Sequence, residues 1–235
     1  MSPPPSGRHR VPFLHEKRIE READLLLAEW TAKGNPVALP IPLDDLVELH
    51  LELTYEVEDL RERLKDLGVL GAIWFDENII RIDTTLDPRE HPSMLGRFNF
   101  TLAHEIGHWR LHRAHLRANP DEAMLFETNA EPAFVCRDGD KRPEEWQADA
   151  FAGCLLMPRP RLREAWAEWR GADDPLALTD LDVRAVHAER KLNENLAMVQ
   201  FCRPLAERFA VSATAMRIRL QALELLVSHI EPRLF

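Results

Sequence analysis

The sequence predicts an α+β protein that is mostly helical, with a small sheet containing antiparallel strands and a helix-turn-helix-like module at the C-terminal end. Three features predict this class. Apolar residues recur at helical spacing over long segments such as residues 16–32. Short apolar runs with turn residues between them occupy residues 53–83. Helical spacing on both sides of a short turn marks residues 205–225.

The elements are expected in a defined order along the chain. The first helix, at 16–32, carries Ile19, Ala23, Leu26 and Trp30 on one face and stops at a Gly-Asn-Pro sequence. The elements expected after it are a helix at 43–51, a strand at 53–57, a helical turn at 61–67, strands at 70–75 and 79–83, a helix at 94–113 capped by Ser93, a strand at 133–136, helices at 144–157, 161–169 and 179–193, and the two helices of 205–225. We expect the hairpin at 70–83 to offer a sheet edge to an extended peptide.

Length and composition bound the domain organisation. The 235 residues allow one medium domain or one with an appendage. Residues 1–12 are rich in Pro, Ser and Arg and are expected to form a disordered tail. A Gly-Ala-Asp-Asp-Pro linker starts at Gly171, so we expect a main domain at 13–170 and a helical module at 171–235.

Charge and cysteine content narrow the function classes. The formal net charge of −10 disfavours direct nucleic-acid binding, because duplex-binding surfaces are basic. Cys136, Cys154 and Cys202 are odd in number and widely spaced, so they predict no disulfide framework and fit a reducing cytoplasm. The N-terminal residues lack the apolar core of a signal peptide, and no apolar run is long enough to span a membrane.

The predicted helix at 94–113 contains the sequence His-Glu-x-x-His at residues 104–108. Residues four apart on a helix lie about 6 Å apart along its axis and about 40° apart around it, so His104 and His108 can bind one metal ion. Glu105 can reach a water on that ion. This is the zinc metallopeptidase pattern, with Glu105 as the general base.

A second motif lies on the predicted helix at 144–157. Glu145 can complete the metal site, and Asp149, one turn later, can accept the free N–H of a ligand histidine. Glu144 is the alternative ligand, but its side chain would point about 100° away. His112 is about 12 Å along the helix from His104, so we expect a structural or surface role for it rather than metal ligation.

Three segments resemble the ImmA/IrrE family of metallopeptidases. Residues 100–108, Phe-Thr-Leu-Ala-His-Glu-Ile-Gly-His, are similar to its helix signature. Residues 145–158, which end in Leu-Leu-Met-Pro, and residues 205–220 are similar to two later family segments. The chain departs from the family at Asn99, where an Arg is frequent, and in its long connection between the two motifs.

The resemblance implies a zincin-like domain that binds Zn²⁺ and cleaves a protein substrate. In several members the substrate is a helix-turn-helix transcriptional repressor, cleaved during stress or mobile-element induction. We therefore expect a zinc endopeptidase with His104, His108 and Glu145 as ligands and Glu105 as base. The alternative is a non-enzymatic regulator that binds a repressor or DNA on an inactive metallopeptidase scaffold.

Overall fold

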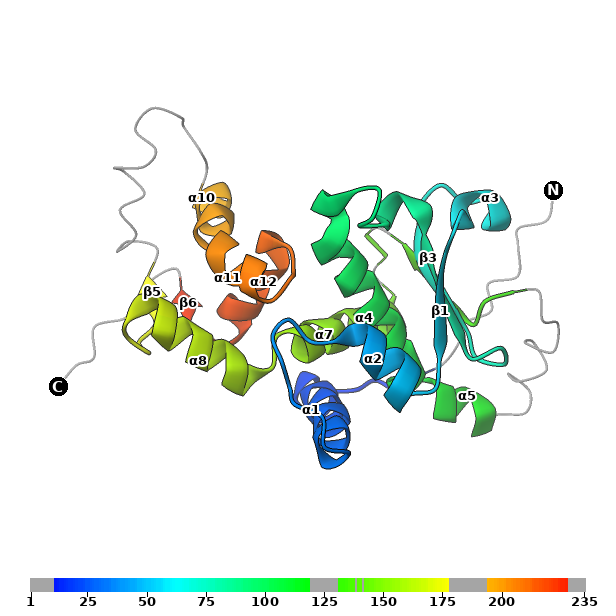
Figure 1. Cartoon of the computed structure of the whole chain (residues 1–235), viewed down its shortest axis with the longest axis horizontal. Helices are drawn as coiled ribbons and strands as arrows, with labels where there is room; N and C mark the ends of the chain where they lie inside the picture. Colours follow the sequence, from blue (N-terminus) through cyan, green and yellow to red (C-terminus); the bar gives the residue numbers. More distant parts are fainter. Residues whose placement is uncertain (1–10, 119–130, 138, 141, 178–193, 228–235) are drawn as a thin grey trace.

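The structure, a computed structural model, describes residues 11–118, 131–137, 139–140, 142–177 and 194–227. Its helices and its small mixed sheet confirm the predicted α+β class. Two helices, α4 (Leu95–Leu111) and α7 (Pro143–Leu156), lie between the sheet and the C-terminal helices (Figure 1). Of the predicted disordered tail only Val11 and Pro12 are described, and the helix predicted at 179–193 lies outside the described residues.

The N-terminal helix α1 (Glu16–Ala32) has the predicted bounds and packs its apolar face against α7. The side chains expected on that face are buried. The predicted helix at 43–51 is instead a short α-helix, α2 (Leu43–Asp45), that continues as a π-helical turn, η1 (Leu46–His50). These elements pack beside the lower end of α4 (Figure 1).

Four strands form the sheet next to α4. They are β1 (Thr54–Glu58), β2 (Val69–Trp74), β3 (Ile79–Asp83) and β4 (Phe134–Arg137), in the order β1-β3-β2-β4. β1 runs parallel to β3, while β2 is antiparallel to both β3 and β4. The hairpin of β2 and β3 therefore lies inside the sheet, and our expectation that it offers a free edge is wrong. The backbone groups of both strands are already paired on two sides, which leaves β1 and β4 as the edges.

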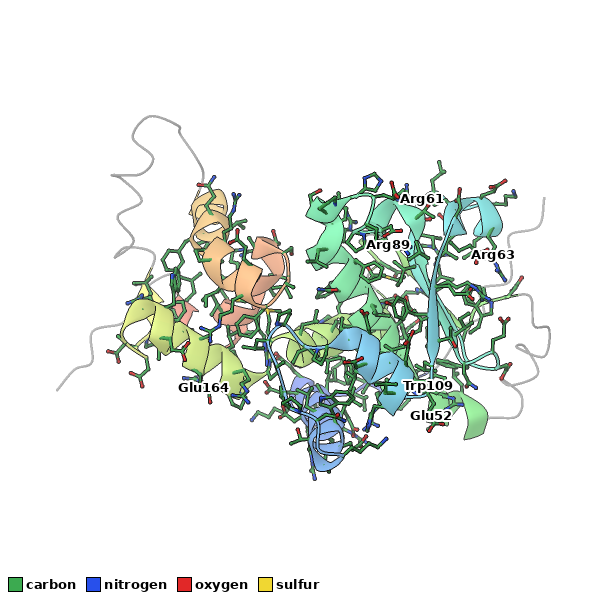
Figure 2. All side chains as sticks on the ribbon, in the orientation of Figure 1. Glu52, Arg61, Arg63, Arg89, Trp109 and Glu164 are labelled. Carbon is green, nitrogen blue, oxygen red and sulfur yellow. The ribbon has the colours of Figure 1, made fainter. Side chains whose placement is uncertain are left out.

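The two faces of this sheet are covered differently. One face packs on α4, and the other carries a smaller apolar cluster around Trp74, beneath α3 (Leu60–Leu64). The guanidinium groups of Arg63 and Arg81 lie 5.0 and 4.5 Å from the centre of the Trp74 ring. Figure 2 shows Arg63 on α3 at this outer side of the sheet. Trp109, near the end of α4, packs its ring 5.9 Å from that of Phe75.

The C-terminal half of the fold is helical. It comprises α8 (Arg159–Arg170), α10 (Glu194–Phe201), α11 (Arg203–Arg208), α12 (Ala213–Ala222) and a two-stranded pair of β5 (Leu176–Ala177) with β6 (Leu226–Val227). Ser212 caps α12 by accepting a hydrogen bond from the Ala215 N–H, as predicted. The rings of Trp169 and Phe201 lie 4.7 Å apart, so α8 packs on α10. The domain boundary at residue 170 stays a prediction.

The turn between α11 and α12 rests on the first turns of α4. The Asn99 side-chain amide donates to the carbonyl oxygen of Ala210 at 2.9 Å. A Cβ built on Gly96 would lie 2.7 Å from backbone atoms of Val211 and Ser212. Asn99, the departure from the family pattern, therefore fixes this turn against the helix that carries the histidines.

The remaining short elements refine the predicted boundaries. They are η2 (Thr84–Leu86), η3 (Pro92–Met94) and α5 (Arg113–Ala118). Ser93 does not cap α4, because it lies inside the 3₁₀ turn η3, and the N-cap residue of α4 is Met94. Among the described residues, no helix combines the length and the apolar character needed to cross a bilayer.

Candidate metal centre

α4 presents His104 and His108 one turn apart toward α7, and both rings are buried. Their Nε2 atoms lie 3.0 Å apart. The two helices approach closely because α4 has no side chain at Gly107, where a Cβ would lie 3.2 Å from the backbone of Ala148. This contact brings the first turns of α7 opposite the histidines.

Glu145 is the α7 residue that meets the two rings. Its Oε2 lies 3.2 Å from His104 Nε2, and its Oε1 lies 3.6 Å from His108 Nε2. Glu144 instead pairs with Arg142 at 3.4 Å. Ligand atoms of His104, His108 and Glu145 all lie within 4.8 Å of one another, so of the two glutamates Glu145 is the one placed to join the histidines.

Each histidine ring is held at its other nitrogen. His104 Nδ1 lies 2.8 Å from a carboxylate oxygen of Asp149, and His108 Nδ1 lies 2.9 Å from His112 Nδ1. Burial lowers the pKa of His112 to about 3, so its ring is neutral and its Nδ1 can accept a hydrogen bond from His108 Nδ1–H. Donation from both Nδ1 atoms leaves the Nε2 lone pairs free to face each other and Glu145.

His112 therefore lies in the site, although it is not among the converging donors. Of the two roles expected for His112, the structural role is confirmed and the surface role is wrong. The His112 side chain at the end of α4 is buried, with only 1% of it exposed. Gln147 of α7 lies beside the His112 ring and donates to the carbonyl oxygen of Pro12 at 3.3 Å. Within the described residues, His112 Nε2 and Gln147 Oε1 themselves lack well-oriented hydrogen bonds.

Glu105 is fully buried, and neither of its carboxylate oxygens has a hydrogen-bond partner among the described residues. Its carboxylate fits against β2 because Gly71 has no side chain: a Cβ there would lie 3.1 Å from Glu105 Oε1 and 2.6 Å from Thr101 Cγ2. Burial raises the pKa of Glu105 to about 8. A buried carboxylate without partners is costly for folding, and such groups occur where chemistry requires them.

Arg142 lies at the outer side of the site and hydrogen-bonds to Glu145 Oε1 at 3.1 Å. The same guanidinium contacts Asp140 at 3.0 Å. It thereby holds the Glu145 carboxylate toward the histidines. Burial alone would raise the pKa of Glu145, but His104 and His108 lower it more, so the net shift is downward.

The donors fit a divalent cation. Two imidazole nitrogens and one carboxylate are the ligand set of a catalytic zinc site. Burial opposes a charge on His104, yet Cys136, Asp149 and Glu145 around it raise its pKa well above the usual value. Burial acts the other way on the second histidine and lowers the pKa of His108 to about 4.

Two residues near this centre were not anticipated from the sequence. Phe134 of β4 stacks on the His108 ring at 4.0 Å with the planes 12° apart. Cys136, two residues later, points to the same side of the strand and has its sulfur near His104 and Glu105. The alternation of Phe134 and Cys136 in a predicted strand was the available signal, but the sequence does not say which strand lies beside the histidines.

A helix with two converging histidines and a buried glutamate, joined by a carboxylate from a second helix beside a small sheet, defines a metallopeptidase-type domain. The sequence profile of a peptidase family, described as the IrrE N-terminal-like domain, matches residues 78–221. The chain therefore belongs to the IrrE N-terminal-like family, which confirms the resemblance seen in the sequence.

No curated protein matches the sequence. Among solved structures, a Mycobacterium tuberculosis transcriptional regulator is similar, with 16% identity and a TM-score of 0.45, over 88% of this chain and 48% of that one. The present chain thus spans about half the length of that regulator.

Proposed function

We propose that this protein is a cytoplasmic zinc-dependent endopeptidase that cleaves a helix-turn-helix transcriptional repressor in a stress or mobile-element response. The observation that carries the proposal is the meeting of His104, His108 and Glu145 beside the partnerless carboxylate of Glu105. Membership of a peptidase family supports the class of reaction. The repressor substrate comes from the family resemblance.

The residues divide into three roles. His104, His108 and Glu145 would hold the metal, while Asp149, His112 and Arg142 orient these ligands. When bound, a zinc ion supplies a Lewis acid that polarises a peptide carbonyl and acidifies water. Glu105 accepts the proton of the attacking water and passes it to the leaving amine. Its burial keeps its basicity high, because a charge there is poorly solvated.

The proposal is tested by metal content and by cleavage. We expect one zinc per full-length chain, and we expect the chain to cleave a small helix-turn-helix repressor encoded beside its gene. Chelation should stop cleavage and zinc should restore it. A chain that binds the repressor tightly, contains stoichiometric zinc and never cuts it would favour the non-enzymatic alternative.

A further inference from the structure

The Cys136 side chain lies inside the candidate metal centre. It projects from β4 and is 8% exposed. Its sulfur and the ligand atoms of His104 and Glu105 all lie within 4.8 Å of one another. The thiol is within hydrogen-bonding reach of the His104 ring. No disulfide competes for it, because Cys136, Cys154 and Cys202 are all unpaired.

The Glu105 carboxylate is a second, independent indication that a ligand binds beside Cys136. Both of its oxygens are buried without partners among the described residues, and one of them lies within 4.8 Å of the Cys136 sulfur. Gly71 pairs with Cys136 across β2 and β4, and its missing side chain keeps that space open. A metal ion or its water is the natural occupant of a space bordered by imidazole, carboxylate and thiol groups.

We propose that Cys136 is a fourth ligand of the metal and closes the site in the resting protein. The inference rests on the proposed function, since it concerns the same ion. Three protein ligands leave one tetrahedral position open for catalysis, whereas four close it, and thiolate sulfur is a preferred zinc ligand. Cys136 is the side chain in the described structure that can bring sulfur to this position.

Coordination requires a small movement of β4. The Cys136 sulfur lies close to His104 and Glu105, but it is not in the cluster formed by His104, His108 and Glu145. To bind the same ion, the sulfur must therefore shift toward His108 and Glu145. β4 is an edge strand, and its pairing with β2 slips in register between Val69 and Gly71, next to Cys136. An edge strand with a local irregularity can move with fewer broken hydrogen bonds than an inner one.

When Cys136 binds the metal, its S–H bond breaks, a sulfur–metal bond forms, and the proton passes to solvent water. In this closed state no metal position would be left for the attacking water. The peptidase would therefore stay inactive until β4 withdraws the Cys136 sulfur.

X-ray absorption on the zinc-loaded full chain tests the proposal directly. We expect one sulfur at about 2.3 Å from zinc together with nitrogen and oxygen at about 2.0–2.2 Å. The Cys154→Ala/Cys202→Ala double variant is the matched control and should keep that sulfur, because Cys136 is then the single remaining thiol. Cobalt substitution gives a second readout, a near-ultraviolet thiolate-to-metal charge-transfer band.

The Cys136→Ser variant should lose both signals, bind zinc about 10-fold more weakly or worse, and cleave substrate faster than the wild type. If X-ray absorption finds only nitrogen and oxygen around the zinc of the wild type, the proposal is overturned. The centre formed by His104, His108 and Glu145 would then remain intact. A chain that binds no stoichiometric metal would overturn this proposal and the proposed function together. The wild-type and double-variant spectra decide the question even if Cys136→Ser does not fold.

Discussion

Gly107 of α4 meets the backbone of Ala148 on α7 so closely that a Cβ at Gly107 would lie 3.2 Å from both the Cα and the carbonyl oxygen of Ala148. A glycine inside a helix is about 1 kcal/mol less favourable than an alanine. The close packing of α4 on α7 offsets this loss of helix stability. The crossing places the first turns of α7, including Glu145, against the histidine face of α4.

The first prediction concerns this crossing. Gly107→Ala should push α7 away from α4 and weaken zinc binding, because the Glu145 carboxylate then lies farther from the histidines. Gly153→Ala on α7 is the matched control: its Cβ meets nothing within 4 Å, so it should stabilise the protein by roughly 0.5–1 kcal/mol and leave zinc affinity unchanged. Isothermal titration with zinc and thermal melting compare the two. Equal affinities would show that the close approach does not set the metal site.

The second prediction concerns the base. Glu105→Gln should slow repressor cleavage by about 10²–10⁴-fold while zinc stoichiometry stays at the wild-type value. The amide has nearly the same shape but cannot take a proton from water. Single-turnover cleavage with the zinc content measured on the same sample separates the two effects. Cleavage at the wild-type rate would remove Glu105 from its assigned role.

The third prediction concerns His112, whose Nδ1 lies 2.9 Å from His108 Nδ1. His112→Leu should lower zinc affinity by about 10–100-fold, because His108 loses the partner that fixes its tautomer. His112→Gln offers an amide oxygen to His108 and should recover part of the loss. His91→Ala, at an exposed position, serves as the control. If the Leu and Gln variants bind zinc equally, the hydrogen bond has no role in orienting His108.

The fourth prediction concerns Arg219 of α12, which is 6% exposed and joins three parts of the fold. Its guanidinium donates to Glu20 of α1 at 2.6 Å and to the carbonyl oxygen of Met157 at 3.2 Å. Arg219→Ala should lower the free energy of unfolding by roughly 1–3 kcal/mol, since it removes the donor to the buried Met157 carbonyl and to the partly buried Glu20 carboxylate. Arg161→Ala removes an exposed pair with Glu164 and should change stability by well under 1 kcal/mol. Chemical denaturation measures both, and similar losses would contradict the structural role of Arg219.

The fifth prediction is a pH dependence that comes from Glu20. Burial raises the pKa of its carboxyl, but hydrogen bonds from Arg159 and Arg219 outweigh burial, so the folded pKa lies below the usual 4.5. A lowered folded pKa gives stability that is present above the unfolded pKa and is lost as pH falls toward the folded value. Melting temperatures between pH 6 and pH 3 should therefore fall more steeply for the wild type than for Glu20→Gln. Parallel curves would show that the pairing does not shift this pKa.

Much of the helical fold could be predicted from the sequence because helical order is local. The bounds of α1 follow from apolar spacing and the Gly-Asn-Pro stop, and Ser212 caps α12 as its position before the helix indicates. The predicted separation of His104 and His108 follows from the pitch of one helix. Glu145 could be chosen over Glu144 because the two residues point in different directions around α7.

The residue pattern was therefore enough to predict most of the described helices, although not α5 or α10, together with the hairpin and the donors carried on α4 and α7. Only the tertiary structure decided that β2 and β3 lie inside the sheet, that His112 supports His108, and that Cys136 faces Glu105 across from Gly71. The tertiary structure also placed the largely buried Arg219 of α12 against Glu20 of α1. The physical reason is that strand order and the contacts between distant residues depend on how elements pack, whereas periodicity reports only which face of each element is turned inward.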